Sequence, residues 1–348
     1  MRTADFDYHL PPELIAQTAV EPRDASRLLV LHAEGTVEHR GFRDLAGYLR
    51  PGDALVLNDT RVIMARLRGR LLPGGGAVEA LLLRDLGRGR WEAMVRPGRR
   101  LRPGREVGFD GLPAVVDEAR GDGFVVLRFP AGRDPTAQGA LPLPHYIHEL
   151  PADPERYQTV YAREPGSAAA PTAGLHFTPT LLDELRERGI GVYFITLHVG
   201  PGTFRPVSVE DPSEHPMHEE WFTISDETAA ALNAARAAGG RLVAAGTTVV
   251  RTLEQVADTA PDGALRGASG WTRLLILPGY QFKAIDALIT NFHLPRSTLL
   301  MLVSAFAGRE RVLAAYAEAV RQRYRFYSFG DAMLLLPAER GEQPLPAD

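Results

Sequence analysis

The sequence predicts an α/β main domain, a mixed sheet with packed helices, plus an inserted small all-β, barrel-like domain. Two observations predict this fold class. Between about residues 65 and 130, short apolar runs are split by Gly and Pro turns and lack a helical period, which is typical of strands. On both sides of this stretch, apolar runs alternate with helix-like segments, which indicates a sheet covered by helices. We therefore expect the α/β domain over 1–62 and 145–348 and the insert over 63–144.

The elements follow from these patterns in chain order. The first part of the α/β domain has apolar strands at 27–32 and 53–62 around a helix-like segment at 42–49. In its second part, helices are expected at 178–188, 226–238, 248–258, 297–307 and 309–323, and strands at 191–199, 241–246, 273–278, 286–292 and 332–336. In the insert, strands are expected at 66–72, 77–83, 90–96, 105–109, 114–119 and 124–129.

The helix at 178–188 has clear signals at both ends. Thr178 can cap its start, Pro179 suits a first helical residue, and Gly189 can close it. The loop that feeds this helix is unusual, because it holds a Thr-Ala-Gly turn and His176.

The insert is locally basic. Between Arg61 and Arg105 there are 12 arginines and three acidic residues, whereas the whole chain has a net charge of −4. This imbalance favours a surface for a polyanion, and an ordinary solvated surface explains it about as well.

The composition excludes several kinds of site. The chain has no Cys, which excludes disulfides, thiolate zinc sites, iron–sulfur clusters and Cys nucleophiles. Lys283 is the only lysine and follows Phe282, so a Walker P-loop is absent, and no G-x-G-x-x-G or G-x-S-x-G motif occurs. The start of the sequence lacks a signal-peptide pattern, and the apolar run at 299–308 is too short to span a bilayer, so we expect a cytoplasmic protein.

Three histidines stand in apolar surroundings at strand or loop ends: His176, His198 and His293. Loops of this kind converge outside the carboxyl ends of the strands in an α/β sheet, where ligands bind. A single such His is more often a packed core residue, but three of them favour a site. A zinc trio lacks supporting carboxylate or HExxH spacing, so we expect no metal.

A Gly-Thr-Thr turn leads from the strand at 241–246 into a helix that starts near Thr247. Free N–H groups at such a helix start suit a carboxylate or a phosphate, although a tight βα connection alone also explains the turn. The segment 215–221 holds His218 and Glu220, and Pro216 favours a loop there.

Long motifs in order along the chain resemble one known family. They are NDTRVIMARL (58–67), LPHYI, YQTVYA (157–162), AAPTAGLHFT (169–178), TLHVGPGTFRPV (196–207), HPMHEEW (215–221), AAGTTVVRTLE (244–254), the run 277–308 and YRFYSFGDAMLL (324–335). The chain resembles the S-adenosylmethionine:tRNA ribosyltransferase-isomerases of queuosine biosynthesis over nearly its whole length, and most weakly over 66–140.

This resemblance implies an enzyme that transfers and isomerises the ribosyl moiety of S-adenosylmethionine. The acceptor is the aminomethyl group of 7-aminomethyl-7-deazaguanine at the tRNA wobble position, the product is epoxyqueuosine-tRNA, and adenine and methionine leave. S-adenosylmethionine is then a co-substrate, with no permanently bound cofactor and no metal, because its sulfonium acidifies C5′. The partner is tRNA, no membrane is involved, and a monomer is the simplest assumption.

The local patterns and the resemblance together give the candidate residues. Catalytic candidates are His176, His198, His293 and Lys283. Substrate-binding candidates are Asn58, Arg61, Thr172, Gly174, Gly202, Thr203, His218, Glu220, Thr247, Thr248, Arg251 and Asn291. Candidates for tRNA binding are Arg99, Arg100 and Arg102.

We expect His176 to be neutral near pH 7 because of desolvation and a nearby helix start, and we hypothesise that it is the base for C5′–H. A packing histidine is the alternative. Two other functions also stay open: an RNA-binding module and an ordinary S-adenosylmethionine-dependent tRNA methyltransferase. Free adenine among the products separates all three.

Overall fold

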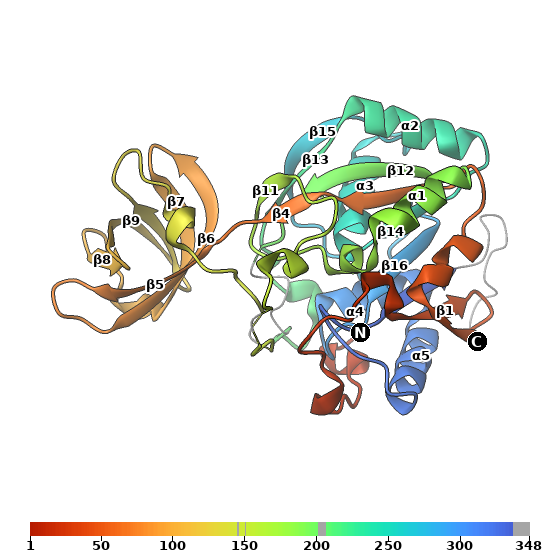
Figure 1. The fold of residues 1–348 in the computed structure, drawn as a ribbon, viewed down its shortest axis with the longest axis horizontal. Helices are drawn as coiled ribbons and strands as arrows, with labels where there is room; N and C mark the ends of the chain where they lie inside the picture. The colour runs from red at the N-terminus through yellow and green to blue at the C-terminus, as the bar shows by residue number, and fades with distance from the viewer. Residues whose placement is uncertain (145, 150, 201–206, 337–348) are drawn as a thin grey trace. The chain divides into compact units, whose positions relative to one another are not determined.

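The structure is a computed structural model that describes residues 1–144, 146–149, 151–200 and 207–336. The chain divides into two compact units, each described by itself here (Figure 1). Unit 1 comprises Met1–Asp59, His145–Arg163 and Pro171–Asp348, and unit 2 comprises Thr60–Pro144 and Glu164–Ala170. The sequence analysis assigned 164–170 to the α/β domain. The segment clusters with unit 2 because β11 (Glu164–Ser167) pairs in parallel with β4 (Thr60–Val62).

Unit 1 is built on a nine-stranded mixed sheet, which confirms the expected fold class. The strand order is β15-β13-β12-β3-β14-β16-β17-β1-β2. Four central neighbours, β12, β3, β14 and β16, run parallel, and β17 pairs in parallel with β1. The strands are β1 (Arg27–His32), β2 (Val37–Gly41), β3 (Ala54–Asn58), β12 (Gly191–Leu197), β13 (Glu220–Ile224), β14 (Leu242–Ala245), β15 (Ala268–Thr272), β16 (Ala287–Asn291) and β17 (Ala332–Leu336).

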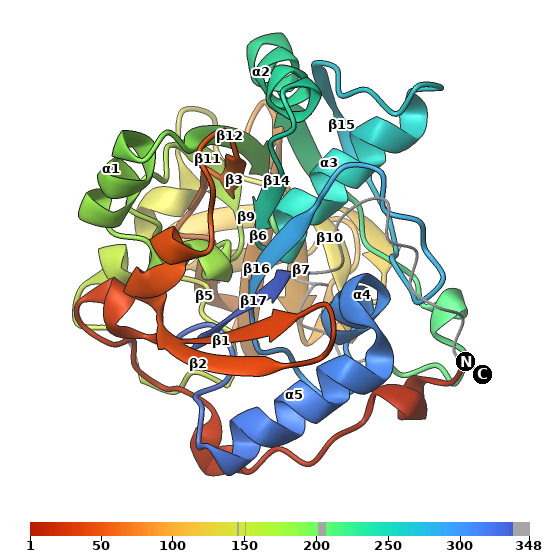
Figure 2. The same cartoon turned by 90° about the vertical axis from the view of Figure 1, so that its right-hand side faces the viewer.

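Helices cover both faces of this sheet, as Figure 2 shows with α1 on one side and α3 on the other. They are α1 (Pro179–Glu187), α2 (Asp226–Ala237), α3 (Thr247–Thr259), α4 (Thr298–Ala307) and α5 (Arg309–Arg321). One apolar core joins α1 and the 3-10 helix η4 (Phe42–Gly47) to alternate residues of the strands, such as Leu55 and Leu57 of β3. The longest helices of the described part have 13 residues, and none there has the length and hydropathy to cross a membrane.

The predicted end signals of α1 are confirmed. Thr178 caps the helix through a hydrogen bond from the Leu181 N–H at 3.1 Å, Pro179 is the first helical residue, and Gly189 has a φ of 80°. This helix start follows directly on the 3-10 helix η8 (Thr172–His176). A short, well-defined turn therefore places His176 at the sheet edge.

Unit 2 is a closed six-stranded antiparallel barrel, as expected, in the order β10-β7-β6-β5-β8-β9. Its strands are β5 (Arg66–Leu71), β6 (Ala77–Gly87), β7 (Arg90–Arg96), β8 (Glu106–Phe109), β9 (Leu112–Gly121) and β10 (Phe124–Arg128). Alternate residues fill the interior, for example Leu67 and Leu71 of β5 and Val107 and Phe109 of β8.

Three parts of the prediction for unit 1 need correction. Residues 273–278 are apolar but form no strand, and the strand lies just before them at β15. The sequence of β15, ASGWT, has little apolar alternation because its outer face is solvated. The segment 215–221 was expected to be a loop, yet its end starts β13, and the short polar strand β2 was missed.

Candidate functional site

The carboxyl ends of the parallel strands meet at one edge of the unit 1 sheet. β3 ends at Asn58, β14 leads to Gly246, and β16 ends at Asn291. Asn58 is fully buried, and its amide bridges two neighbours: Nδ2 donates to Thr248 Oγ1 at 3.2 Å and to the Leu197 carbonyl at 3.0 Å. This edge therefore brings several predicted residues together, in the position where α/β sheets bind ligands.

The start of α3 lies at this edge. Gly246 precedes the helix with a φ of 100°, a backbone conformation that a residue with a Cβ rarely adopts. Thr247 and Thr248 are buried and form the first turn. No acceptor within the described ranges takes the N–H of either residue, so these donors, at the positive end of the helix, remain available for an anionic or carbonyl group.

Both ring nitrogens of His176 are engaged. Nδ1 lies 2.7 Å from Ser26 Oγ, and Nε2 lies 3.1 Å from Asn291 Nδ2. Asn291 Nδ2 also donates to the Tyr327 carbonyl at 3.2 Å, which fixes the orientation of the amide. Because Nδ2 is a donor, Nε2 must accept, and the proton must lie on Nδ1 and point to Ser26. The ring also stacks on Phe42 with centroids 4.9 Å apart.

The other end of the Asn291 amide is unpaired. Oδ1 is buried and has no hydrogen-bond partner among the described residues. Buried hydroxyl groups elsewhere in unit 1 share this property, among them those of Thr159, Ser304 and Tyr327. Because an unsatisfied buried acceptor is costly, Asn291 Oδ1 is a place where a ligand N–H or O–H would be stabilised.

All three predicted histidines are neutral at pH 7. Burial, together with the nearby charges of Arg156, Arg23 and Arg325, lowers the pKa of His176 to about 3. Burial alone lowers the pKa of His293 to about 3 and that of His198 to about 4. For His176 the sequence analysis expected neutrality from desolvation and a helix start, and the second cause is instead the arginine charges.

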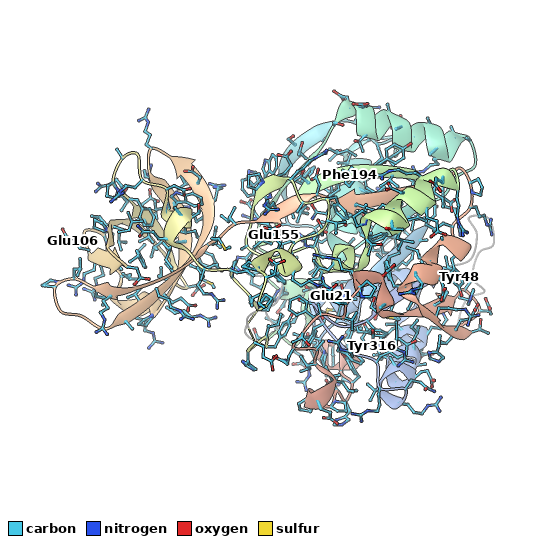
Figure 3. All side chains as sticks on the ribbon, in the orientation of Figure 1. Glu21, Tyr48, Glu106, Glu155, Phe194 and Tyr316 are labelled. Atoms are coloured by element: carbon cyan, nitrogen blue, oxygen red, sulfur yellow. The ribbon has the colours of Figure 1, made fainter. Side chains whose placement is uncertain are left out.

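His293 and His198 are held differently. The Nε2 atom of His293 lies 2.7 Å from Thr290 Oγ1, and its backbone N–H donates to the hydroxyl of Tyr316 on α5, which is labelled in Figure 3. No partner for Nδ1 of His293 is found among the residues the structure describes. His198 is half-buried and stacks on Trp221, with ring centroids 5.1 Å apart.

Glu220 and Arg251 form a buried ion pair that ties α3 to β13. Arg251 Nη1 donates to Glu220 Oε2, and Arg251 Nε donates to the Leu274 carbonyl at 3.0 Å. The other carboxylate oxygen, Oε1, accepts the N–H of Gly200 at 2.8 Å. The pair thus anchors the segment that leaves β12.

Other predicted residues have different surroundings. A Cβ on Gly174 would meet the Tyr161 hydroxyl at 2.2 Å, so Tyr161 occupies the space beside this glycine. Thr172 and His218 are half-buried. Lys283 is exposed, and its ammonium group pairs with Asp258.

The remaining predicted residues belong to unit 2 or lie outside the described part. Arg61 lies on β4 in unit 2, and Arg99 and Arg102 are exposed there. Gly202, Thr203 and the Arg100 side chain lie outside the described residues. In the described ranges no three His, Asp or Glu side chains cluster as metal ligands would.

Sequence reasoning missed Ser26 and Tyr327. Ser26 is fully buried and holds His176 Nδ1, although the two residues are 150 positions apart. The carbonyl of Tyr327 accepts a hydrogen bond from Asn291 and so orients its amide. Tyr327 has a backbone φ of 72°, which could not be predicted from the sequence. A single Ser before a strand likewise does not indicate that it binds a distant histidine.

Comparison with known proteins gives consistent matches to one family. The family described as Queuosine biosynthesis protein matches residues 3–335. The S-adenosylmethionine:tRNA ribosyltransferase-isomerase of Symbiobacterium thermophilum is 61% identical over 343 residues, which is 97% of this chain and 100% of that protein. The protein of the same name from Moorella thermoacetica is 60% identical over 344 residues, with the same two coverages.

A solved structure is also similar. The crystal structure of S-adenosylmethionine tRNA ribosyltransferase from Thermotoga maritima has 44% sequence identity and a TM-score of 0.57, and the match covers 95% of this chain and 100% of that one. The match of the family over nearly the whole chain and the identity to its members lead to one conclusion: the chain belongs to the S-adenosylmethionine:tRNA ribosyltransferase-isomerase family of queuosine biosynthesis proteins.

Proposed function

We propose that this enzyme transfers and isomerises the ribosyl moiety of S-adenosylmethionine onto the aminomethyl group of 7-aminomethyl-7-deazaguanine in the tRNA wobble position. The products are epoxyqueuosine-tRNA, adenine and methionine. The observation that carries the proposal is the 61% identity, over the full length of the relative, to a ribosyltransferase-isomerase. S-adenosylmethionine is a co-substrate, and its sulfonium supplies the acidity of C5′–H when it is bound.

The co-substrate binds at the carboxyl edge of the unit 1 sheet. Two features support this placement. The N–H groups of Thr247 and Thr248 are free donors for an oxygen of the ligand, and the unpaired Oδ1 of Asn291 is an acceptor for a ligand N–H or O–H. Donor and acceptor groups on one rigid edge fix a ligand in a single orientation.

His176 acts as a positioning residue in this proposal. Its Nε2 accepts from Asn291 and its Nδ1–H donates to Ser26, so neither ring nitrogen is free for a substrate proton. By holding Nδ2 of Asn291, His176 fixes the orientation of the amide. Oδ1 of the same amide then points away from the His176 ring, where it has no hydrogen-bond partner among the described residues. His176 is then a packed histidine, the alternative given from the sequence, and it also orients the ligand-binding amide of Asn291.

His293 is our candidate for the base that takes the C5′ proton. It follows Asn291 by two residues, Thr290 holds its Nε2, and burial keeps it neutral. The same burial makes it a weak base, so proton transfer relies on the acidity that the sulfonium gives to C5′–H. His198, with a pKa lowered to about 4 by burial, is the second candidate.

The exposed arginines of unit 2 support a contact with tRNA. Arg99 and Arg102 have no ion pair among the described residues, and together with Arg100 they form the densest basic run of the sequence. Unpaired guanidinium groups of this kind bind phosphates.

The experiment measures products. Incubated with S-adenosylmethionine and tRNA that carries the aminomethyl-deazaguanine, the enzyme should release adenine and methionine in equal amounts. His293→Asn should bind S-adenosylmethionine normally and lose adenine release by about 10²-fold or more. S-adenosylhomocysteine in place of adenine would identify a methyltransferase, and no product at all would identify a binding module. Near-normal turnover of His293→Asn would transfer the role of base to His198.

A further inference from the structure

Two contrasting groups stand out among the arginines of unit 2. On β7, β9 and β10, three arginines pair with acidic residues: Arg90 with Glu118 at 2.7 Å, Arg120 with Glu92 at 2.7 Å and Arg128 with Asp117 at 2.9 Å. Their charge is neutralised on the barrel itself. The basic character counted along the sequence is therefore unevenly distributed over the surface.

Strand β5 carries the other group. Its residues alternate, with Leu67 and Leu71 in the barrel core and Arg66, Arg68 and Arg70 on the outer face. Arg66 is engaged with the Leu143 carbonyl at 2.8 Å and lies 3.8 Å from Glu79. Arg68 and Arg70 are exposed and have neither an ion pair nor a side-chain hydrogen bond among the residues described. On one strand their Cα atoms lie about 7 Å apart.

These two arginines line an open cleft of about 770 Å³. The cleft lies along β5 and the neighbouring β8, which Figure 1 shows side by side, and its walls include Gly69, Gly108, Asp110 and Pro113. Gly108 lies directly opposite Arg70, and therefore on the same outer face, where it adds no side chain to the cleft. A Cβ on Gly69 would lie 2.3 Å from the Gly108 carbonyl oxygen and 2.7 Å from the Phe109 ring of the barrel core, so Gly69 permits the close approach of the two strands.

The lining indicates which part of a nucleic acid would fit. It contains two free guanidinium groups, one carboxylate, Asp110, that forms no ion pair with them, and no aromatic side chain. Unpaired RNA bases are bound by stacking on aromatic rings, whereas phosphates are bound by Arg side chains. The cleft therefore matches the sugar–phosphate backbone of RNA by charge and lacks what base recognition needs.

We propose that the β5 cleft binds backbone phosphates of the tRNA substrate through Arg68 and Arg70. This rests on the proposed function for the identity of the RNA. The contact is independent of base sequence, so it contributes affinity and orientation. The lining of the cleft does not include the predicted Arg99 and Arg102, which belong to the segment between β7 and β8.

The test compares two double variants with the same loss of charge. Arg68→Gln/Arg70→Gln removes the free pair, and Arg120→Gln/Arg128→Gln removes two exposed but neutralised arginines of the same barrel. The affinity for tRNA that carries the aminomethyl-deazaguanine is measured from 50 to 200 mM salt, the range over which phosphate contacts weaken strongly. Thermal unfolding and affinity for S-adenosylmethionine serve as controls and should be unchanged in both variants.

We expect the first variant to bind tRNA about tenfold more weakly at low salt, with the slope of log K against log[salt] reduced in magnitude by about 1.5 for two lost phosphate contacts. The second variant should keep the wild-type slope. A wild-type slope in the first variant, or an equal loss of tRNA affinity in both variants, would contradict phosphate binding in the cleft. If wild-type enzyme binds tRNA with the expected slopes but releases no adenine, the proposed function fails and the cleft stands.

Discussion

At the residue scale, the site depends on how each buried polar atom is satisfied. His176, Ser26 and Asn291 form a chain of hydrogen bonds in which every donor and acceptor is engaged except Asn291 Oδ1. Sequence reasoning predicted that His176 is neutral, because an imidazole between Leu175 and Phe177 is desolvated. It could not predict the two partners, which come from positions 26 and 291 and meet only through the fold.

Burial of His176 makes the stability of the enzyme depend on pH. Its pKa is about 3 in the folded state and about 6.5 in the unfolded chain, so the unfolded chain binds more protons between these values. Stability from this residue is complete above pH 6.5 and is lost as the pH falls toward 3. Between pH 7.5 and pH 5, wild type should lose about 2 kcal/mol more unfolding free energy than His176→Asn.

Urea unfolding at both pH values measures this difference. His176→Asn serves as the control for the other titrating groups, because it shares all of them with the wild type. Parallel pH profiles would mean that His176 is accessible to protons in the folded protein.

At the element scale, α3 connects the parts of the site. Its first turn offers free N–H groups, and Arg251, one turn further on, pairs with Glu220 of β13. Glu220 in turn accepts the N–H of Gly200 at the end of β12. One ion pair thus fixes the relative positions of three segments of unit 1 that are distant in sequence.

Removing one partner of this pair should be far worse than removing both. Arg251→Met removes the guanidinium partner of the buried Glu220 carboxylate and should destabilise the protein by about 3–5 kcal/mol. Arg251→Met/Glu220→Met removes both charges and should recover most of that loss. The unfolding free energies of wild type and both variants decide this. Equal losses in the single and double variants would show that contacts other than the ion pair hold these segments.

Elements were predictable where local patterns are strong. All six barrel strands alternate apolar and polar residues between Gly or Pro turns, and they were found at the expected places. The helices α1, α3, α4 and α5, each with buried apolar residues, were predicted from their apolar periodicity. β2 and β15 were missed because solvated edge strands have few apolar residues. Residues 273–278 were wrongly predicted as a strand because they include an apolar run that does not join the sheet.

At the scale of the whole molecule, the family resemblance predicted the reaction, and the fold explains where its groups gather. Asn58, Thr248 and Asn291 lie at one sheet edge because β3, β14 and β16 run parallel. Physical reasoning from single motifs could not reach that grouping, since it depends on strand order. The distribution of charge on unit 2 could not be predicted from the sequence either, because the acids that neutralise Arg90, Arg120 and Arg128 lie on other strands of the barrel.

We expect the reaction to be independent of metal, because the sulfonium of S-adenosylmethionine itself supplies the acidity of C5′–H. Turnover should therefore be unchanged after dialysis against EDTA, measured as adenine release with and without added zinc. The absence of Cys and of ligand spacing in the sequence motivates this prediction. Loss of activity with EDTA and its recovery with zinc would require the histidines to be reassigned as ligands.

The central claim is that the ribosyl carbons of S-adenosylmethionine, and not its methyl group, become part of the tRNA. The most direct measurement uses S-adenosylmethionine labelled with one isotope in the ribose and another in the methyl group, together with tRNA bearing the aminomethyl-deazaguanine. The account predicts that the ribose label appears in the tRNA while the methyl label leaves with methionine. Methyl label in the tRNA, with the ribose label in a released nucleoside, would contradict it.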